Sequence, residues 1–259
     1  MASLLHSFAL RVIQPDVVGV TCSGSQARGE AGAHSDVDLQ IYVRGLPASP
    51  YDRYTMRNWD GHLVSLKTLT VEAQSMELSE PSAAIWAVPG LRQALILHDP
   101  QGEVRALKQV AIDFQWEPLQ PRADEYAAEE LMACSEEAHK ILAGLQAADE
   151  SKVLYGVWGL MKGLTAAVAT QRAVMIETEN RYFDLVQESV GASSEWTRHF
   201  RVALGADAAG LASIRPFVSR GRAALRLYRL TADLFAAIIP GKHRLVIETT
   251  LQLLAEAGF

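Results

Sequence analysis

The stretch GSQARGEAGAHSDVDL, residues 24–39, decides the fold and the chemistry expected of this chain. It begins with a Gly-Ser pair directly after residues 17–22, a β-branched run with the composition of a buried strand. It ends in Asp-Val-Asp, at the start of a second apolar run over residues 37–43. Residues 26–30 have room for one short helix. The string therefore predicts a strand, a tight turn, a helical turn and a second strand.

Asp36 and Asp38 are the candidate metal ligands of this string. Side chains alternate along a strand, so residues two positions apart point to the same face. Two carboxylates placed side by side repel each other unless a cation or a shared proton compensates. Oxygen ligands of this kind suit Mg²⁺, whose coordination is often completed by substrate phosphates. The pair therefore predicts a magnesium site, although an isolated Asp-x-Asp is more often a solvated strand edge.

Gly24 and Ser25 form the candidate phosphate-binding turn. They come directly after one predicted strand and just before the predicted short helix. Backbone amides, a helix N-terminus and a serine hydroxyl at such a place can hold the polyphosphate of a nucleotide. A Gly-Ser pair alone is an ordinary turn. Its combination with two nearby carboxylates, between two strands, favours a nucleotide site.

Composition narrows the class of protein further. The 259 residues are 49% hydrophobic and 21% charged, as in an ordinary globular protein with room for two domains. A net charge of −6 argues against a general nucleic-acid binder and favours a small-molecule or cationic partner. No run approaches eighteen uninterrupted apolar residues, so no membrane segment is expected. The two distant cysteines fit a reduced, cytoplasmic compartment.

The pattern of elements predicts an α+β protein of two domains. The first half alternates helices with short strands, including residues 62–69 and 95–97. Two prolines in residues 117–121 interrupt any helix and mark the boundary, which separates a catalytic domain, 1–117, from a helical domain, 118–259. In the second domain the apolar spacing predicts helices over residues 122–146, 152–172, 181–190, 217–238 and 242–257.

The first domain resembles the nucleotidyltransferases of the DNA polymerase β superfamily. Strand, Gly-Ser, a helical turn and Asp-x-Asp at the next strand form the signature of that superfamily. The resemblance implies a small mixed sheet with helices, and ATP bound with Mg²⁺. It implies that Gly24 and Ser25 contact the nucleotide phosphates, that Asp36 and Asp38 ligate catalytic Mg²⁺, and that Arg28 faces the outer phosphates. The other interpretation of Arg28 is a surface salt bridge.

One feature departs from that superfamily. Its members commonly carry a third carboxylate on a later strand, which here corresponds to residues 62–69. That strand reads HLVSLKTL and contains no acid, and Ser65 stands where the carboxylate is expected. Either a second metal is held weakly, or the catalytic base comes from elsewhere in the fold.

In the second domain, Glu129-Glu130-Leu131 is followed by Glu136 and, four residues later, by Lys140. This pattern resembles the aminoglycoside 4′-O-adenylyltransferases, the kanamycin nucleotidyltransferase type. In that family a helix after the boundary carries Glu-Glu-Leu and then Glu-x-x-x-Lys. The resemblance implies that Glu136 is the general base and that Lys140, on the same helix face, contacts the nucleotide. Glu129, Glu130 and Glu137 would then bind the ammonium groups of the antibiotic. A solvated helix face is the competing interpretation of these acids.

The leading hypothesis is therefore transfer of AMP from ATP to a hydroxyl of an aminoglycoside, with antibiotic resistance as the result. The resemblance implies the 4′-hydroxyl as acceptor and a homodimer in which the second subunit completes the cleft. Alternative acceptors are streptomycin or spectinomycin, a lincosamide, or a protein hydroxyl. The alternative from another class is a catalytically silent nucleotide-binding module, which the missing third carboxylate favours.

Overall fold

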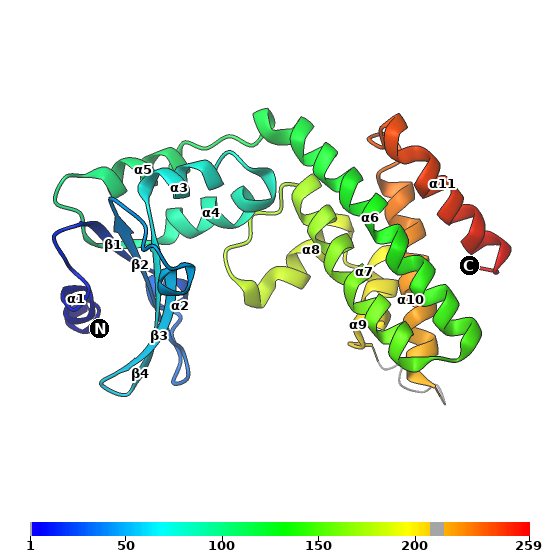
Figure 1. Cartoon of the computed structure of the whole chain (residues 1–259), viewed down its shortest axis with the longest axis horizontal. Coiled ribbons are helices and arrows are strands. Elements are labelled where there is room, and N and C mark those ends of the chain that lie inside the picture. Colours follow the sequence, from blue (N-terminus) through cyan, green and yellow to red (C-terminus); the bar gives the residue numbers. More distant parts are fainter. Residues whose placement is uncertain (1, 208–214) are drawn as a thin grey trace. The chain divides into compact units, whose positions relative to one another are not determined.

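The computed structural model describes residues 2–207 and 215–259, and these divide into two compact units (Figure 1). The first unit comprises Met1–Glu117 together with Met175–Thr178. The second comprises Pro118–Val174 and Glu179–Phe259. The short segment of the first unit that returns late in the chain is held by a backbone bond, in which Ile176 N–H donates to the Ile85 carbonyl at 2.8 Å.

A five-stranded mixed sheet organises the first unit. Its strands are β1 (Val17–Ser23), β2 (Val37–Val43), β3 (Tyr54–Trp59), β4 (His62–Leu69) and β5 (Leu95–His98). Their order across the sheet is β3-β4-β2-β1-β5. The pair β2–β4 is parallel, and the other three pairs are antiparallel. The central strand β2 therefore has β4 on one side and β1 on the other.

The helices of the first unit accompany this sheet. They are α1 (Ala2–Leu10), α2 (Gly24–Arg28), α3 (Val71–Glu77), α4 (Pro81–Gln93) and α5 (Glu103–Ile112), with short 3-10 turns at Pro50–Arg53 and, running into the second unit, Glu117–Leu119. A C-cap glycine ends α2: Gly29 has a φ of 71°, which few other residues adopt at no cost.

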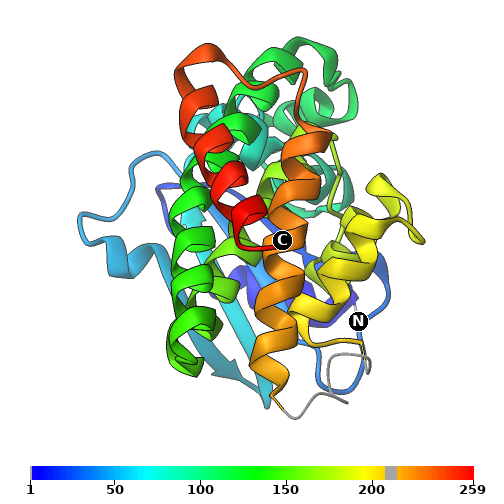
Figure 2. The same ribbon diagram turned by 90° about the vertical axis from the view of Figure 1, so that its right-hand side faces the viewer.

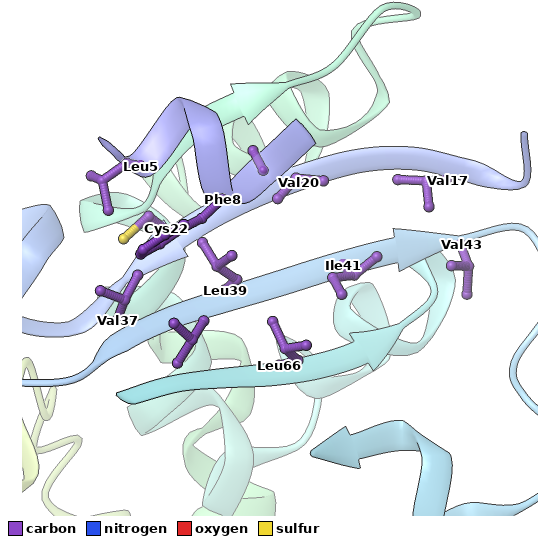
Figure 3. Close-up of a cluster of buried hydrophobic side chains, with 12 residues drawn as sticks. Leu5, Phe8, Val17, Val20, Cys22, Val37, Leu39, Ile41, Val43 and Leu66 are labelled. Carbon is purple, nitrogen blue, oxygen red and sulfur yellow. The ribbon is translucent and has the colours of Figure 1, made fainter. Parts of the chain in front are cut away.

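One face of the sheet is apolar and packs against α1 (Figure 3). Val37, Leu39 and Ile41 of β2 lie on this face with Leu66 of β4, and Phe8 of α1 is completely buried among these core residues. Because side chains alternate, Asp38 and its neighbours at every second position are directed to the opposite face. The hydrophobic pattern thus fixes which face of the sheet presents the polar groups.

The second unit is helical. Its helices are α6 (Gln120–Ala147), α7 (Glu150–Gln171), α8 (Tyr182–Val190), α9 (Glu195–Leu204), α10 (Pro216–Leu234) and α11 (Gly241–Glu256), with a 3-10 turn at Glu179–Arg181. A tight turn joins α6 to α7, with Ala148 in the left-handed region and the Asp149 side chain capping α7. Figure 2 shows α10 and α11 beside α6, which they contact along their lengths.

Glycines allow α6 and α7 to approach closely. A Cβ on Gly156 of α7 would lie 2.8 Å from a side-chain carbon of Ile141 on α6, and one on Gly144 of α6 would lie 2.8 Å from Val153. Among the described residues, α7 is the one helix that is long and apolar enough to cross a membrane. Of its most apolar 18-residue stretch, 61% is buried inside the structure. Its apolar residues therefore serve the helix packing of this unit.

The predicted fold class is confirmed: a small mixed sheet with helices precedes a helical region. The predicted strands over residues 37–43 and 62–69 have the observed bounds. The sequence pattern did not predict strand β3 or the helices α3, α4 and α9. Strand β3 is an edge strand with mostly exposed side chains, so it lacks apolar alternation. Helix α4 contains Pro89, which normally argues against a helix interior.

Candidate active site

A row of polar residues crosses the sheet at Asp38. In the strand register, Asp38 of β2 pairs with Ser23 of β1 on one side and with Ser65 of β4 on the other. Met56 of the edge strand β3, an apolar residue, pairs with Ser65 at the end of the row. These four paired residues form the Asp38 row. The parallel pairing of β2 with β4 places Asp38 beside Ser65, although 26 residues separate them in the chain. The sequence alone gives no such neighbour.

Gly24 makes room for one oxygen of the Asp38 carboxylate. The residue opens α2 directly after β1, with a φ of 67°. A Cβ at this position would lie only 2.3 Å from Asp38 Oδ2. A side chain here would therefore be strained by the backbone and would also displace the carboxylate. This is the close approach that the Gly-Ser motif requires, and it directs Oδ2 toward the turn.

Ser65 holds the other oxygen of the same carboxylate. Its hydroxyl donates to Asp38 Oδ1 at 2.6 Å, and the residue is only 6% exposed. A charge-assisted bond of this length is short and strong. The carboxylate of Asp38 is thus fixed between two elements, with Oδ1 bonded to β4 and Oδ2 facing the glycine turn.

Asp36 lies immediately before β2, half-buried at the end of the loop that follows α2. Gln26 Nε2, from α2, donates to the Asp36 backbone carbonyl at 3.5 Å, which ties the short helix to this point. The loop is closed further by Ser35, whose Oγ accepts from the Gly32 N–H at 2.9 Å. Ser25, half-buried, is the second residue of α2.

Arg28 is engaged within the first unit. Its Nε donates to Glu30 Oε2 at 2.7 Å, and its Nη1 lies 3.5 Å from Gln93 Oε1 and 3.2 Å from the Glu177 carbonyl. Only 14% of the side chain is exposed. In this arrangement the guanidinium links α2 to the end of α4 and to the returning segment. A phosphate contact by Arg28 stays a prediction, and it would require exchange of at least one of these bonds.

A pocket of about 310 Å³ lies on the polar face of the sheet. Its floor is formed by Gln40 of β2 and Lys67 of β4, which pair with each other in the strand register. Each lies two positions beyond a residue of the Asp38 row. Gln74 and Glu77 of α3 and Trp86 of α4 complete its polar wall. Small residues of α4, among them Ala83, Ala87 and Gly90, leave the space open. Strand alternation gives the only sequence signal for this pocket.

The polar groups of the pocket are not fully satisfied. Gln74 is 3% exposed. Its Nε2 donates to Glu77, and its Oε1 has no hydrogen-bond partner within the described part of the chain. Lys67 Nζ lies 3.8 Å from Glu77 Oε1, a loose ion pair. A buried amide oxygen without a donor costs free energy, which a ligand O–H or N–H group would recover. The pocket thus suits a polar ring bearing hydrogen-bond donors.

The thiol nearest the site is not a nucleophile candidate. Burial, with a further contribution from the Asp38 charge, raises the pKa of Cys22 to about 12. Burial also raises the pKa of Cys134, in the second unit, to about 12. Both thiols are free and buried, and they remain protonated at neutral pH.

The predicted acids of the second unit lie on α6. Glu136 is 75% exposed and pairs with Lys140 at 2.8 Å, and this hydrogen bond and charge lower the pKa of its carboxyl. Glu137 is 19% exposed, and its Oε1 accepts from Lys140 Nζ at 3.0 Å. Its Oε2 is buried with no partner among the described residues. A Cβ on Gly159 of α7 would lie 2.8 Å from the Glu137 carboxyl carbon, so this glycine accommodates the acid.

Two further acids of α6 differ in environment. Glu129 is about half exposed and pairs with Lys242 of α11 at 3.4 Å. Glu130 is half-buried, and burial raises the pKa of its carboxyl above the ordinary value, against the opposing charge of Lys162. Their predicted contacts with substrate stay predictions. The environment of Glu130 favours its neutral form, and that of Glu129 is an ordinary surface ion pair.

The donor set of the Asp38 row fits one divalent cation. Asp36 and Asp38 offer carboxylate oxygens, the ligands that Mg²⁺ prefers, and the glycine at position 24 leaves Oδ2 of Asp38 uncovered by a Cβ. Within residues 2–207 and 215–259, no group of three or more His, Cys, Asp or Glu side chains is arranged to hold a metal. The cation would therefore depend on water and substrate oxygens for the rest of its coordination.

Comparison with known proteins agrees with this geometry. Residues 7–89 match the family model described as the nucleotidyltransferase domain, and this span contains the whole Asp38 row. The fold is similar to that of a nucleotidyltransferase-like protein from Exiguobacterium sibiricum, with a TM-score of 0.50 and 14% identity, over 93% of this chain and 76% of that one. A search of curated proteins finds no match. The chain thus carries a nucleotidyltransferase domain, the mark of a transferase.

Proposed function

We propose that this protein transfers AMP from ATP to a hydroxyl group of a small-molecule acceptor, with Mg²⁺ bound by Asp36 and Asp38. The observation that carries the proposal is the fixed carboxylate of Asp38, held between Ser65 and the glycine turn. A cation bound there would neutralise charge on the phosphates as the reaction proceeds. The side chains would align the reacting groups, because transfer of this kind depends almost entirely on alignment and charge stabilisation.

The arrangement of the row supports one direction for the proposed reaction. If the outer phosphates lie at Gly24 and Ser25, on the β1 side of Asp38, pyrophosphate leaves toward that side. The attacking and leaving oxygens lie roughly in line across the phosphorus. The acceptor hydroxyl would therefore approach from the β4 side. The pocket lined by Gln40 of β2, Lys67 of β4 and Trp86 of α4 lies on the same polar face of the sheet. We propose that one ring of the acceptor occupies this pocket and donates to Gln74 Oε1.

An aminoglycoside is the first acceptor to test. The acids of α6, Glu129, Glu130 and Glu137, would attract its ammonium groups, and the resemblance to the 4′-O-adenylyltransferases favours its 4′-hydroxyl. The same resemblance supports a homodimer. Streptomycin, spectinomycin, lincosamides and protein hydroxyls remain alternative acceptors, because the pocket groups that carry the argument, Gln74 and Glu77, accept hydrogen bonds from any hydroxylated or aminated ring.

A carboxylate of α6 is the proposed general base. It would take the proton of the acceptor hydroxyl as that oxygen bonds to the α-phosphorus. The resemblance favours Glu136. Lys140 bonds to both acids, to Glu136 at 2.8 Å and to Glu137 at 3.0 Å, so this bond does not distinguish them, but Glu136 is 75% exposed and Glu137 only 19%. One oxygen of Glu137 is buried and has no hydrogen-bond partner among the described residues. We therefore favour Glu137, with Glu136 as the alternative.

The decisive experiment is a turnover assay with α-labelled ATP and Mg²⁺ across kanamycin, tobramycin, streptomycin, spectinomycin and lincomycin. Labelled antibiotic is expected for at least one aminoglycoside, and Asp38→Asn should abolish it. Label transferred only to a protein would instead assign a protein hydroxyl as the acceptor.

A catalytically silent nucleotide-binding module is the second candidate, favoured by Ser65 at the place where a third acid is expected. A module of this kind is expected to bind ATP with Mg²⁺, and no label is expected to pass from ATP to any of the acceptors. Calorimetric titration of the nucleotide alongside the turnover assay separates this outcome from a protein that does not bind ATP.

A further inference from the structure

We infer that the Asp38 row binds a single divalent cation, and that Ser65 is the residue that sets this number. The inference rests on the proposed function, which it makes more specific. It concerns the number of metal ions at the site rather than the identity of the acceptor. Two-metal sites in phosphoryl-transfer enzymes hold ions about 3.5–4 Å apart and need carboxylate oxygens for both.

The first step is the orientation of the Asp38 carboxylate. Its Oδ1 accepts the Ser65 hydroxyl at 2.6 Å, and its Oδ2 faces Gly24, where a Cβ would lie 2.3 Å away. A second ion on the β4 side would need Oδ1 as a ligand. There the positive end of the Ser65 O–H dipole would repel the ion, because this hydroxyl already donates a charge-assisted hydrogen bond to Oδ1. Ser65 thus blocks the β4 side of Asp38.

The second step is the count of acidic ligands near the row. Asp36 and Asp38 are the two acids at the row, and Ser65 of β4 is neutral. The other acid of the loop before β2, Glu30, accepts a hydrogen bond from Arg28. The nearest acid of the neighbouring pocket wall, Glu77 of α3, is engaged by Gln74 and Lys67. The part of the chain that the structure describes has no cluster of three metal-binding side chains. Two carboxylates suffice for one cation completed by phosphates, but leave a second without an anchor.

The third step is burial. Ser65 is 6% exposed, and its partner on the edge strand, Met56, is 44% exposed. Solvent therefore does not compete for the hydroxyl, and the bond to Asp38 persists in the folded protein.

One consequence concerns the base. With a single cation bound on the Gly24 side of Asp38, no second ion is available to acidify the acceptor hydroxyl on the β4 side. A protein carboxylate must then remove the proton. The single-cation site thus explains why this chain needs a base outside the strand over residues 62–69.

The test is a titration with Mn²⁺ in the presence of saturating α,β-methylene-ATP. The electron paramagnetic resonance signal of free Mn²⁺ is measured at each step, so that bound Mn²⁺ is obtained by difference. We expect one tightly bound Mn²⁺ per chain in the wild type and two in Ser65→Asp. Ser65→Ala should keep one ion, with affinity reduced about 10-fold or more because the carboxylate is no longer oriented. Glu77→Gln is the matched control, since it removes an acid outside the row, and it should leave both number and affinity unchanged.

Each outcome decides the question. Two tight ions in the wild type would overturn the inference and leave the proposed transfer intact. Absence of any bound Mn²⁺ beyond that held by free nucleotide would overturn both. One ion in the wild type, with loss of that ion in Asp38→Asn, supports the inference even if Ser65→Asp fails to fold. A folded Ser65→Asp that still binds only one ion would refute the role of Ser65.

Discussion

The two units hold their acidic side chains in different ways. Asp38 of the first unit is fixed by two neighbouring strands: a hydroxyl of β4 occupies one oxygen, and the glycine after β1 accommodates the other. Glu136 of the second unit is 75% exposed and held only by Lys140 of its own helix. Pairs at i and i+4 contribute about 0.2–0.5 kcal/mol and form on any helix surface. Asp38 is positioned for one task, whereas Glu136 has the environment of an ordinary surface residue.

This difference shows where a sequence motif is informative. The Gly-Ser and Asp-x-Asp spacing requires particular residues because three elements converge on it, so few unrelated sequences share it. The Glu-x-x-x-Lys spacing requires only a helix. A motif is therefore more specific when more elements of the fold constrain it, and variants at Asp38 and at the acids of α6 distinguish the two cases.

The largest effect is expected at the fixed carboxylate. Asp38→Asn keeps the shape and the bond from Ser65 but removes the negative charge that binds the cation. Several kcal/mol of transition-state stabilisation would be lost, so the rate of AMP transfer should fall by about 10³-fold or more. The measurement is transfer of label from ATP by a variant whose circular dichroism and melting temperature match the wild type. Activity within 10-fold of the wild type would rule out Asp38 as a metal ligand.

The next effect compares the two neighbouring acids of α6. Glu137→Gln should lower kcat by about 10²–10⁴-fold, the usual loss for a general base, with KM for ATP little changed. Glu136→Gln should cost less than about 10-fold, because its carboxyl is 75% exposed and forms an ordinary surface ion pair. The two positions differ by about 100° around the helix, so each serves as the control for the other. The reverse ranking would restore Glu136 as the base, and two fully active variants would place the base elsewhere.

A smaller effect is expected at the turn. Ser25→Ala removes one hydroxyl from the proposed phosphate site while retaining the backbone of α2. A hydrogen bond to a charged group contributes about 1.5–3 kcal/mol, so kcat/KM for ATP should fall by about 10–100-fold. Ser7→Ala in α1, whose hydroxyl only donates to the Leu4 carbonyl, is the matched control. Identical ATP kinetics for the two variants at saturating acceptor would argue against phosphate binding by Ser25.

The strand pattern around the motif could be predicted from the sequence, and the sheet order could not. Alternation of apolar residues gave the bounds of β2 and β4 and the face that Asp38 occupies. The pairing of β2 with β4 brings Ser65 to Asp38, and that pairing depends on β3 and on the helices between them. Strand β3 carries polar, exposed side chains, and α4 contains a proline, so neither has a strong local signal.

The pocket residues were missed for the same reason. Gln74 and Trp86 come from α3 and α4, and only the tertiary fold directs them toward Gln40 and Lys67. In the second unit, helical periodicity gave most of the helices but not the inner face of α6. That face is defined by Gly159 of α7, which makes room for Glu137. Close helix packing at small residues is a property of a pair of helices, which the periodicity of one helix does not contain.

The smallest effect concerns stability and pH. Burial raises the pKa of Glu130 in the folded state, so the native protein binds this proton more tightly than the unfolded chain does. This contribution to stability is present below the unfolded pKa of about 4.5 and is lost as the pH rises through the folded pKa. Glu130→Gln removes the ionisation. The stability of the variant relative to the wild type should therefore increase as the pH rises from about 4 to about 7.

Urea unfolding at the two pH values measures this difference. Glu129→Gln, one residue away, makes the same change in net charge at an exposed ion pair with Lys242, and it should show no gain at pH 7. Equal behaviour of the two variants would mean that general charge repulsion on α6, rather than burial of Glu130, sets the pH dependence. A loss of stability in Glu130→Gln at pH 7 would mean instead that attraction to Lys162 outweighs burial, since that charge opposes the shift.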